Sequence, residues 1–146
     1  MRALVTRVST ASVTVDGEVV SELPRPGLLV LAGVARDEDP ARVRWLANRI
    51  HRLRILDDAR SVAQTGAPVL VVSQFTLHAS TRKGGVPSWS RAAPSGEAAP
   101  LVELLCAELE ALVAEVHRGR FGAHMEVASV NDGPVTIWLD SAQPDY

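Results

Sequence analysis

Two hydroxyl side chains, Ser73 and Thr76, are the candidates for nucleophilic chemistry in this sequence. Both belong to the stretch Ser-Gln-Phe-Thr-Leu at residues 73–77, which follows the apolar run 69–72. A serine or threonine nucleophile needs a base within hydrogen-bond reach, and the sequence offers no obvious base for this stretch. Two explanations stay open: a site assembled from residues distant in the sequence, or a chemistry that does not depend on side chains.

Other familiar constellations are missing from the sequence. The histidines His51, His78, His117 and His124 lack metal-ligand spacing, and a GxSxG elbow or a GxxxxGK phosphate loop does not occur. His51 and His117 fall on predicted helices and are expected at the surface, whereas His78 follows the 73–77 stretch and is expected to have no functional role. The single cysteine, Cys106, excludes an internal disulfide, and its apolar neighbours predict a core position. We therefore predict no metal and no cofactor.

The stretch Asn-Asp-Gly-Pro-Val-Thr at residues 131–136 lies between two short apolar runs, 125–130 and 135–139. Asn, Asp, Gly and Pro each suit a turn, so these residues by themselves predict the turn of a β-hairpin. An X-Pro bond is cis in about 5–6% of folded cases, usually in tight turns. Proline also donates no hydrogen bond, which leaves the preceding carbonyl groups free for another partner.

The sequence resembles the D-aminoacyl-tRNA deacylases, called D-tyrosyl-tRNA deacylases in older naming. Four segments carry the resemblance: the 73–77 stretch, the 131–136 stretch, the opening MRALVTRVSTASVTVDGEV and the Gly-Arg-Phe triplet at 119–121. The resemblance runs essentially from end to end. It implies hydrolysis of the ester that joins an amino acid to the terminal ribose of tRNA. The implied substrates are D-aminoacyl-tRNA and mischarged glycyl-tRNA(Ala), and the implied role is chiral proofreading in translation.

The resemblance also implies a site built largely from main-chain groups, with the ribose 2′-hydroxyl assisting the attack of water. Main-chain N–H groups near Phe75 would hold the ester carbonyl, and the carbonyl groups of Phe121 and Gly133 would hold the substrate ammonium. Carbonyl groups fixed beside the α-carbon would leave no room for an L side chain. The residues so assigned are Ser73, Gln74, Phe75 and Thr76 for catalysis, and Arg7, Phe121, Met125, Gly133 and Pro134 for substrate binding.

Assembly also follows from the resemblance. In this family a Gly-cis-Pro pair reaches into the site of the partner subunit, which implies a homodimer and a cis bond between Gly133 and Pro134. Arg7 matches a residue that steadies this loop. Its position on a predicted strand equally suits an exposed charge at a strand edge, and both interpretations stay open.

Basic residues cluster twice. The first cluster lies on a predicted helix and is expected to be a solvated face: Arg42, Arg44, Arg49, Arg52 and Arg54. The second lies in a predicted loop beside the 73–77 stretch and either contacts tRNA phosphates or is merely solvated: Arg82, Lys83 and Arg91. Trp89 would stack on the terminal adenine or pack within the loop. The chain departs from the family pattern at Val86, at Trp89 and in a shortened 57–68 segment, which concerns the RNA contact.

Two rival functions remain. One is the same reaction through an acyl-enzyme on Thr76. The other is a non-catalytic tRNA-binding accessory domain that has kept the pocket. The intact 73–77 and 131–136 stretches weigh against this second possibility.

Composition sets the broad class. The chain has 146 residues, 47% of them hydrophobic and 22% charged, with a net charge of −2. This balance predicts one globular domain over residues 1–146 and argues against broad, sequence-blind nucleic-acid binding. No charged-then-apolar leader occurs, and no apolar run approaches the ~20 residues of a membrane span. A cytoplasmic protein is therefore expected.

In the first half of the chain, alternating residues predict strands at 3–8, 12–15 and 18–21, with the last two joined by a type I′ turn at Asp16-Gly17. The continuous apolar run 27–34 predicts a buried strand. A helix is expected from Pro40, capped by Asp39, to about Leu53. A short strand could begin at 54–56, followed by a polar loop over 57–68.

In the second half, residues 69–78 predict a buried strand and 79–99 a long loop of the kind that is often functional. A second helix is expected from 101 to about 119, followed by the hairpin of 125–139. The predicted fold is α/β: a mainly antiparallel, barrel-like sheet covered by two helices, as in D-aminoacyl-tRNA deacylases.

Overall fold

The structure, a computed structural model, describes residues 1–112 and 114–144. Its strands are β1 (Arg2–Val15), β2 (Glu18–Glu22), β3 (Gly27–Gly33), β4 (Val69–Ser73), β5 (Val116–Arg118) and β6 (Glu126–Asp140). Its helices are α1 (Pro40–Arg52), α2 (Val62–Thr65) and α3 (Ser95–Ala111), with 3₁₀ turns η1 (Asp57–Ala59) and η2 (Phe75–His78).

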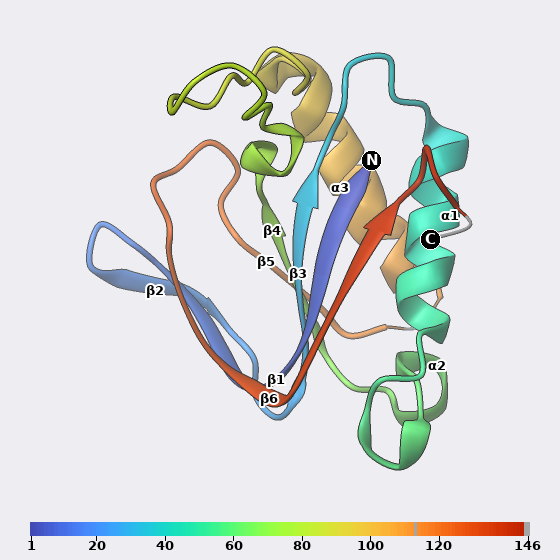
Figure 1. The fold of residues 1–146 in the computed structure, drawn as a ribbon. Helices are drawn as coiled ribbons and strands as arrows, with labels where there is room; N and C mark the ends of the chain where they lie inside the picture. The colour runs from blue at the N-terminus through green and yellow to red at the C-terminus, as the bar shows by residue number, and fades with distance from the viewer. Residues whose placement is uncertain (113, 145–146) are drawn as a thin grey trace.

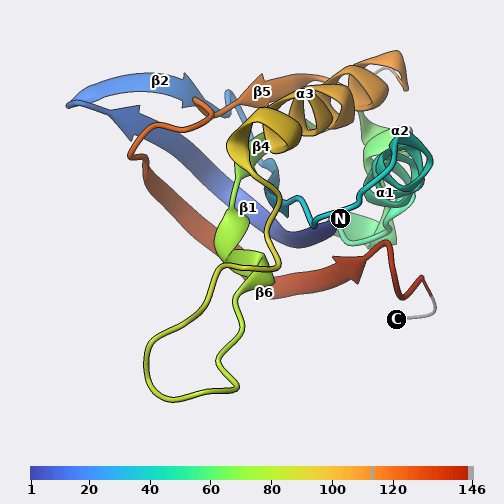
Figure 2. The same cartoon turned by 90° about the horizontal axis from the view of Figure 1, so that it is seen from above.

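The sheet curls into a nearly closed barrel (Figures 1 and 2). Strand β1 pairs antiparallel with β2, β3 and β6, whereas β4 lies parallel between β3 and β5. Helices α1 and α3 pack side by side against one face of the sheet (Figure 2). This confirms the predicted fold class, and the short α2 is a third helix that we did not expect.

Two hydrophobic clusters fill the two sides of the sheet. One lies between the sheet and the helices and includes Val30, Leu46 and Leu105. The other lies inside the curl of the sheet and includes Val13, Leu29 and Leu70. Strands β3 and β4 are therefore buried on both faces, which explains why their sequences are continuous apolar runs.

The first hairpin forms as predicted. Asp16 and Gly17 both have positive φ, 51° and 80°, as a type I′ turn requires. The predicted strands 3–8 and 12–15 are one continuous strand, because β6 pairs along almost the whole of β1.

The predicted hairpin at 125–139 is wrong. Both apolar runs belong to β6, which pairs antiparallel with β1 along its length, so the chain does not reverse direction. Thr136 pairs with Thr6 and Asn131 with Val8, so a step of two residues along β1 corresponds to five along β6. Residues 132–135 are therefore an enlarged bulge, because the extra residues leave the ladder while pairing resumes on both sides.

The second helix is displaced from its predicted position. It begins at Ser95, within the expected loop, and ends at Ala111. The loop prediction relied on the glycine and proline interruptions within 79–99. Burial of Ala98, Leu105 and Leu109 outweighs them, and also outweighs the hydrogen bond lost at Pro100. The region predicted as its last turns forms β5 instead, so His117 lies on a strand.

Three smaller predictions need correction. No strand begins at 54–56, where Leu56 only bridges Arg60. The expected polar loop 57–68 contains η1 and α2, the latter started by Gln64, whose side-chain oxygen accepts from the Ser61 N–H at 3.0 Å. The strand predicted over 69–78 ends at Ser73, because its partner β3 ends at Gly33 and the chain then turns into η2.

Candidate active site

A cavity of about 520 Å³ opens where β4 ends, beside the start of α3 and the segment before β6. Its wall includes five of the nine residues that we assigned to catalysis and substrate binding, Ser73, Gln74, Phe75, Phe121 and Met125, and also Trp89, which we assigned to the tRNA contact. Residues separated by about fifty positions in the sequence are therefore brought together by the parallel pairing of β4 with β5.

The turn after β4 leaves main-chain donors free. The Gln74 N–H donates to the Ala32 carbonyl at 2.7 Å, which ends the ladder, and the chain then enters η2. Among the residues that the structure describes, no group accepts a hydrogen bond from the N–H of Phe75 or of Thr76. Phe75 lines the cavity, so its unengaged amide is a candidate donor to a ligand there.

Thr76 stands behind this wall. Its Oγ1 accepts a hydrogen bond from Gln74 Nε2, and Thr76 is not among the residues that line the cavity. The Gln74 side chain therefore links the wall to η2. The same bond directs the threonine oxygen toward Gln74.

Three aromatic side chains surround the mouth of the cavity. Phe75 and Trp89 meet edge to face with ring centroids 5.3 Å apart, and they are 54% and 43% exposed. Phe121 is also exposed. Aromatic faces open to solvent at a cavity suit a flat ring such as a nucleobase.

Below Phe121, the Met125 side chain folds against the main chain. Its sulfur accepts from the Arg120 N–H at 3.3 Å. A Cβ at Gly119 would lie 2.9 Å from the same sulfur. Gly119 is therefore required for Met125 to close this side of the wall.

The Gly133 bulge is tied to Arg7. The guanidinium donates to the Asp132 carbonyl at 3.0 Å and to the Ile55 carbonyl at 3.1 Å, and the side chain is only 21% exposed. The bond between Gly133 and Pro134 is cis. Arg7 therefore holds the bulge and is not an exposed strand-edge charge.

The predicted residues fall into two groups. In the described part of the chain, Gly133 and Pro134 do not line the cavity, and Arg7 and Asp132 line a separate hollow of about 210 Å³. The bulge is exposed at Gly133 and Pro134. One chain thus presents the cavity and the bulge at two different places.

The second basic cluster lies on a loop that projects from the body of the molecule (Figure 2). Ser80 and Ser88 close the base of this loop through two main-chain hydrogen bonds of 2.9 Å. Arg82, Lys83 and Val86 lie exposed between them, and Trp89 follows directly. The loop therefore carries positive charge next to the cavity mouth.

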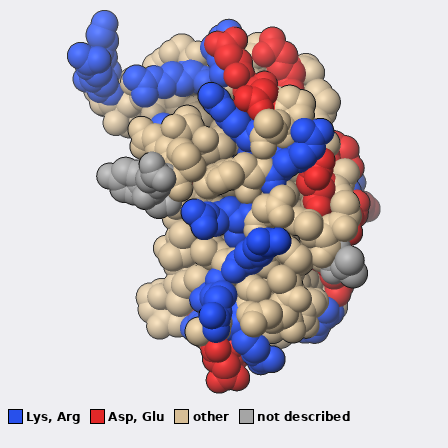
Figure 3. Space-filling view, turned by 90° about the vertical axis from the view of Figure 1, so that its right-hand side faces the viewer, with Lys and Arg blue, Asp and Glu red and all other residues tan. Residues whose placement is uncertain are grey.

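The first basic cluster lies on α1 and just beyond it, on the side of the molecule that Figure 3 shows, where Lys and Arg side chains form a band. Its members are exposed. Arg42 pairs with Glu38 and Asp39, and Arg44 pairs with Glu108. This agrees with the expected solvated face.

Of the histidines and Cys106, all within the described residues, only His124 lies in the cavity wall. Burial raises the pKa of the Cys106 thiol to about 11, in keeping with a core position. His51 is half-buried on α1. Within residues 1–112 and 114–144, no three His, Cys, Asp or Glu side chains lie close enough to hold a metal ion. His124, however, is a titratable side chain in the cavity wall, which we did not foresee.

The sequence also did not reveal the wall supplied by β3 and α3. Ala32, Val34, Pro94, Ala98 and Val102 line the cavity. They are small or apolar residues with no chemical signature. Only the helical start at Ser95, had it been predicted, would have indicated that this segment faces β4.

Residues 4–140 match the family model described as D-Tyr-tRNA(Tyr) deacylase. The chain is 58% identical to the D-aminoacyl-tRNA deacylase of Nocardia farcinica over 97% of this chain and 100% of the relative. It is 56% identical to that of Mycolicibacterium smegmatis over 96% and 99%.

Among solved structures, it resembles the c-Myc DNA unwinding element binding protein, with TM-score 0.89, 34% identity and coverage of 96% and 98%. It shares only the fold with a probable eukaryotic D-amino acid tRNA deacylase, at TM-score 0.79, 14% identity and coverage of 94% and 97%. None of the described helices is long and apolar enough to span a membrane.

Proposed function

Because the chain belongs to the D-Tyr-tRNA(Tyr) deacylase family and is a D-aminoacyl-tRNA deacylase, a hydrolase, we propose how its cavity carries out that reaction. The terminal adenosine enters between the exposed aromatic side chains, and the aminoacyl ester lies against the turn from Ser73 to Thr76. Water attacks the ester carbonyl with help from the ribose 2′-hydroxyl. The amino acid and tRNA then leave.

The observation that carries this proposal is the unengaged Phe75 N–H at the cavity wall. As water adds, negative charge develops on the carbonyl oxygen, and a donor already fixed in place stabilises it. One such donor is commonly worth ~3–4 kcal/mol. Gln74 supports the turn through its bond to Thr76.

Chirality is read by main-chain carbonyl groups. The Phe121 carbonyl binds the substrate ammonium from the cavity wall, and the Gly133 carbonyl binds it from a second copy of the chain. Since Gly133 is exposed and lies away from its own cavity, a neighbouring copy supplies it in a homodimer. Carbonyl oxygens on both sides of the α-carbon clash with an L side chain, whereas D residues and glycine fit.

The 2′-hydroxyl is assigned to the proton transfer because the side chains supply little. His124 is the one titratable side chain in the cavity wall among the described residues, and Thr76 stands outside that wall. We therefore assign no nucleophile and no base to the protein. A tRNA substrate also accords with a cytoplasmic location.

The mechanism is tested with D-tyrosyl-tRNA that ends in 2′-deoxyadenosine and carries the ester on its 3′-oxygen. We expect very slow hydrolysis of this substrate, and substantial activity from both Thr76→Ala and His124→Gln on the ordinary one. A trapped acyl-enzyme on Thr76 would establish the covalent rival. Loss of activity in folded His124→Gln would make that histidine the base.

Substrate range is tested by hydrolysis of D-tyrosyl-tRNA, L-tyrosyl-tRNA and glycyl-tRNA(Ala) in parallel. The D and glycyl esters should be hydrolysed, and the L ester should persist. Binding of all three without turnover would leave only a tRNA-binding accessory domain.

A further inference from the structure

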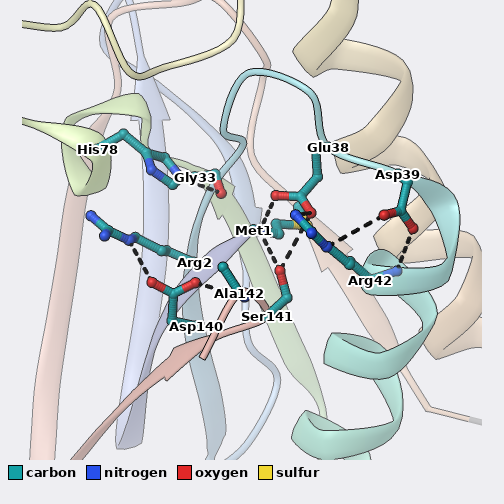
Figure 4. Close-up of polar contacts among 10 residues, drawn as sticks. All are labelled: Met1, Arg2, Gly33, Glu38, Asp39, Arg42, His78, Asp140, Ser141 and Ala142. Carbon is teal, nitrogen blue, oxygen red and sulfur yellow. Dashed lines mark hydrogen bonds and ion pairs between the residues drawn. The ribbon is translucent and has the colours of Figure 1, made fainter. Parts of the chain in front are cut away.

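The turn η2 is held by side-chain bonds to β3 and β1; Figure 4 shows His78 directed at the Gly33 carbonyl and Arg2 bonded to Asp140. At its two ends, the Leu77 N–H donates to the Gln74 carbonyl at 3.3 Å and the Ala79 N–H donates to the Thr76 carbonyl at 3.0 Å. A short 3₁₀ turn of this kind is easily distorted. Two side chains, one from the turn and one from β1, add further bonds.

The first is His78. It is only 5% exposed, and its Nε2 lies 3.1 Å from the Gly33 carbonyl oxygen at the end of β3. Because a carbonyl oxygen only accepts, Nε2 carries the proton and donates. The last residue of η2 is thereby bound to the strand next to β4.

The second is Arg2 on β1. Its Nη1 donates to the Leu77 carbonyl at 2.9 Å, and its Nε donates to Asp140 Oδ2 at 2.9 Å. The guanidinium also lies over the Trp138 ring, 5.3 Å from the centroid. Asp140 and Trp138 belong to β6, so the arginine is oriented by one strand while it binds the turn.

Gly33 allows the turn to sit this close. A Cβ there would lie 2.7 Å from the Gln74 carbonyl oxygen and 3.1 Å from both Leu77 Cβ and His78 Cδ2. The main chain of β3 is therefore the surface against which η2 rests.

We propose that His78 and Arg2 are positioning residues for the hydrolysis: together they fix η2, and with it the Phe75 N–H at the cavity wall. This rests on the proposed function, in which that N–H stabilises the developing negative charge. Neither side chain touches the cavity, whose wall contains neither residue.

Charge makes this support sensitive to pH. Burial is the largest effect and lowers the pKa of His78 from its ordinary value of 6.5. The positive charges of Arg2 and the Met1 amino group also lower this pKa, whereas the Gly33 hydrogen bond and the Asp140 carboxylate raise it. Protonation at Nδ1 would add a positive charge beside Arg2 and that amino group. As pH falls below 6.5 toward the lowered value, the native arrangement therefore loses stability and the turn loosens.

The experiment measures steady-state hydrolysis of D-tyrosyl-tRNA against pH, after subtraction of the uncatalysed rate. In His78→Leu, kcat should fall about 10- to 100-fold with little change in KM, because a misaimed donor slows chemistry more than binding. His78→Gln keeps a donor and should restore most of kcat. It should also lack the fall in rate at acid pH that the wild type shows.

Arg2→Met should lower kcat in the same way, and Arg2→Lys should rescue it only partly, because lysine lacks the forked donors. His117→Gln is the matched control, since His117 lies on β5, bonds to Glu115 just before that strand, and is outside the cavity wall. It should keep the wild-type rate and pH profile.

The inference is overturned if folded His78→Leu matches the wild-type kcat, or if His78→Gln keeps an unchanged acid limb. If His78→Leu does not fold, the pH profile of His78→Gln decides alone. Failure of the proposed function looks different: the wild type itself would then not hydrolyse the ester, and the inference would fall with it.

Discussion

Arg7 is the residue that joins the Gly133 bulge to the rest of the fold. Its guanidinium binds the Asp132 and Ile55 carbonyl groups at once, and it lies within 3.8 Å of Asp57. Two carbonyl groups from distant segments require a forked donor, which lysine does not have. Arg7 therefore links the bulge to the segment that follows α1.

We expect Arg7→Ala to lower kcat/KM for D-aminoacyl-tRNA by about 10- to 100-fold, since hydrogen bonds to charged groups are worth ~1.5–3 kcal/mol. The ratio of kcat/KM for D substrates to that for L substrates should fall. Arg7→Lys should lower both quantities similarly. Arg44→Ala, on the exposed face of α1, should leave both rates unchanged. Wild-type discrimination in Arg7→Ala would show that the bulge needs no such support.

Cys106 belongs to the core rather than to any chemistry. The residue is 2% exposed, and burial raises the pKa of its thiol to about 11. Iodoacetamide at pH 8 should therefore leave the folded protein unmodified and alkylate it fully in denaturant, as read by mass spectrometry. Rapid labelling of the folded protein would contradict this assignment.

At the scale of elements, β6 matters most, because it pairs with β1 along almost the whole of that strand and its bulge interrupts the ladder. Asn131 stabilises the bulge: its Oδ1 accepts from the Val135 N–H at 3.2 Å and its Nδ2 donates to Thr136 Oγ1 at 3.0 Å. Gly133 has φ of 121°, a conformation that L residues avoid. The bulge therefore depends on both side-chain bonds and a glycine.

Gly133→Ala should displace the bulge, because its Cβ would lie 2.6 Å from Arg7 Nη2 and 2.9 Å from Val135 Cγ2. Hydrolysis of D-tyrosyl-tRNA should fall sharply, and stability should fall by about 1–3 kcal/mol.

Gly17→Ala is the matched control. Gly17 also has positive φ, but nothing lies within 4 Å of the added Cβ. Gly17→Ala should lower the free energy of unfolding in urea by about 1–2 kcal/mol and should keep the wild-type rate of D-tyrosyl-tRNA hydrolysis. Equal catalytic loss in both variants would mean that the effect is not local to the bulge.

At the scale of the whole molecule, the cavity and the bulge of one chain lie apart, and the bulge is exposed beside an apolar strand surface. Val130, just before it, is 56% exposed. The outer edge of β6 has no partner strand among the described residues. These features favour a two-fold assembly in which each bulge meets the other copy's cavity.

We expect light scattering to give a dimer at assay concentration. A sharper test mixes Gly133→Ala with Phe121→Ala, each impaired in a different part of the site. Random exchange makes half of the dimers mixed, each with one intact cavity facing one intact bulge, so about a quarter of wild-type activity should return. No recovery on mixing, or a fully active monomer, would contradict sites shared between subunits.

Much of this protein could be predicted from its residues in order. The type I′ turn at Asp16-Gly17, the buried strand β3 and the start of α1 at Asp39-Pro40 depend on φ preference, apolar runs and capping, which act between neighbours. The 73–77 and 131–136 stretches identified the family for a related reason: their residue types are locally specific.

Only the tertiary structure decided the rest. Residues 125–139 contain turn residues, yet they form one strand because β1 offers a partner along its whole length. Ser95 begins a helix despite nearby Gly and Pro, because the helix buries Ala98 and Leu105 against the sheet. His78 at the end of η2 bonds to Gly33 across 45 residues, and Arg2 bonds to Leu77 of the same turn across 75 residues. Such contacts gain their free energy from burial and pairing between distant segments, which no local pattern encodes.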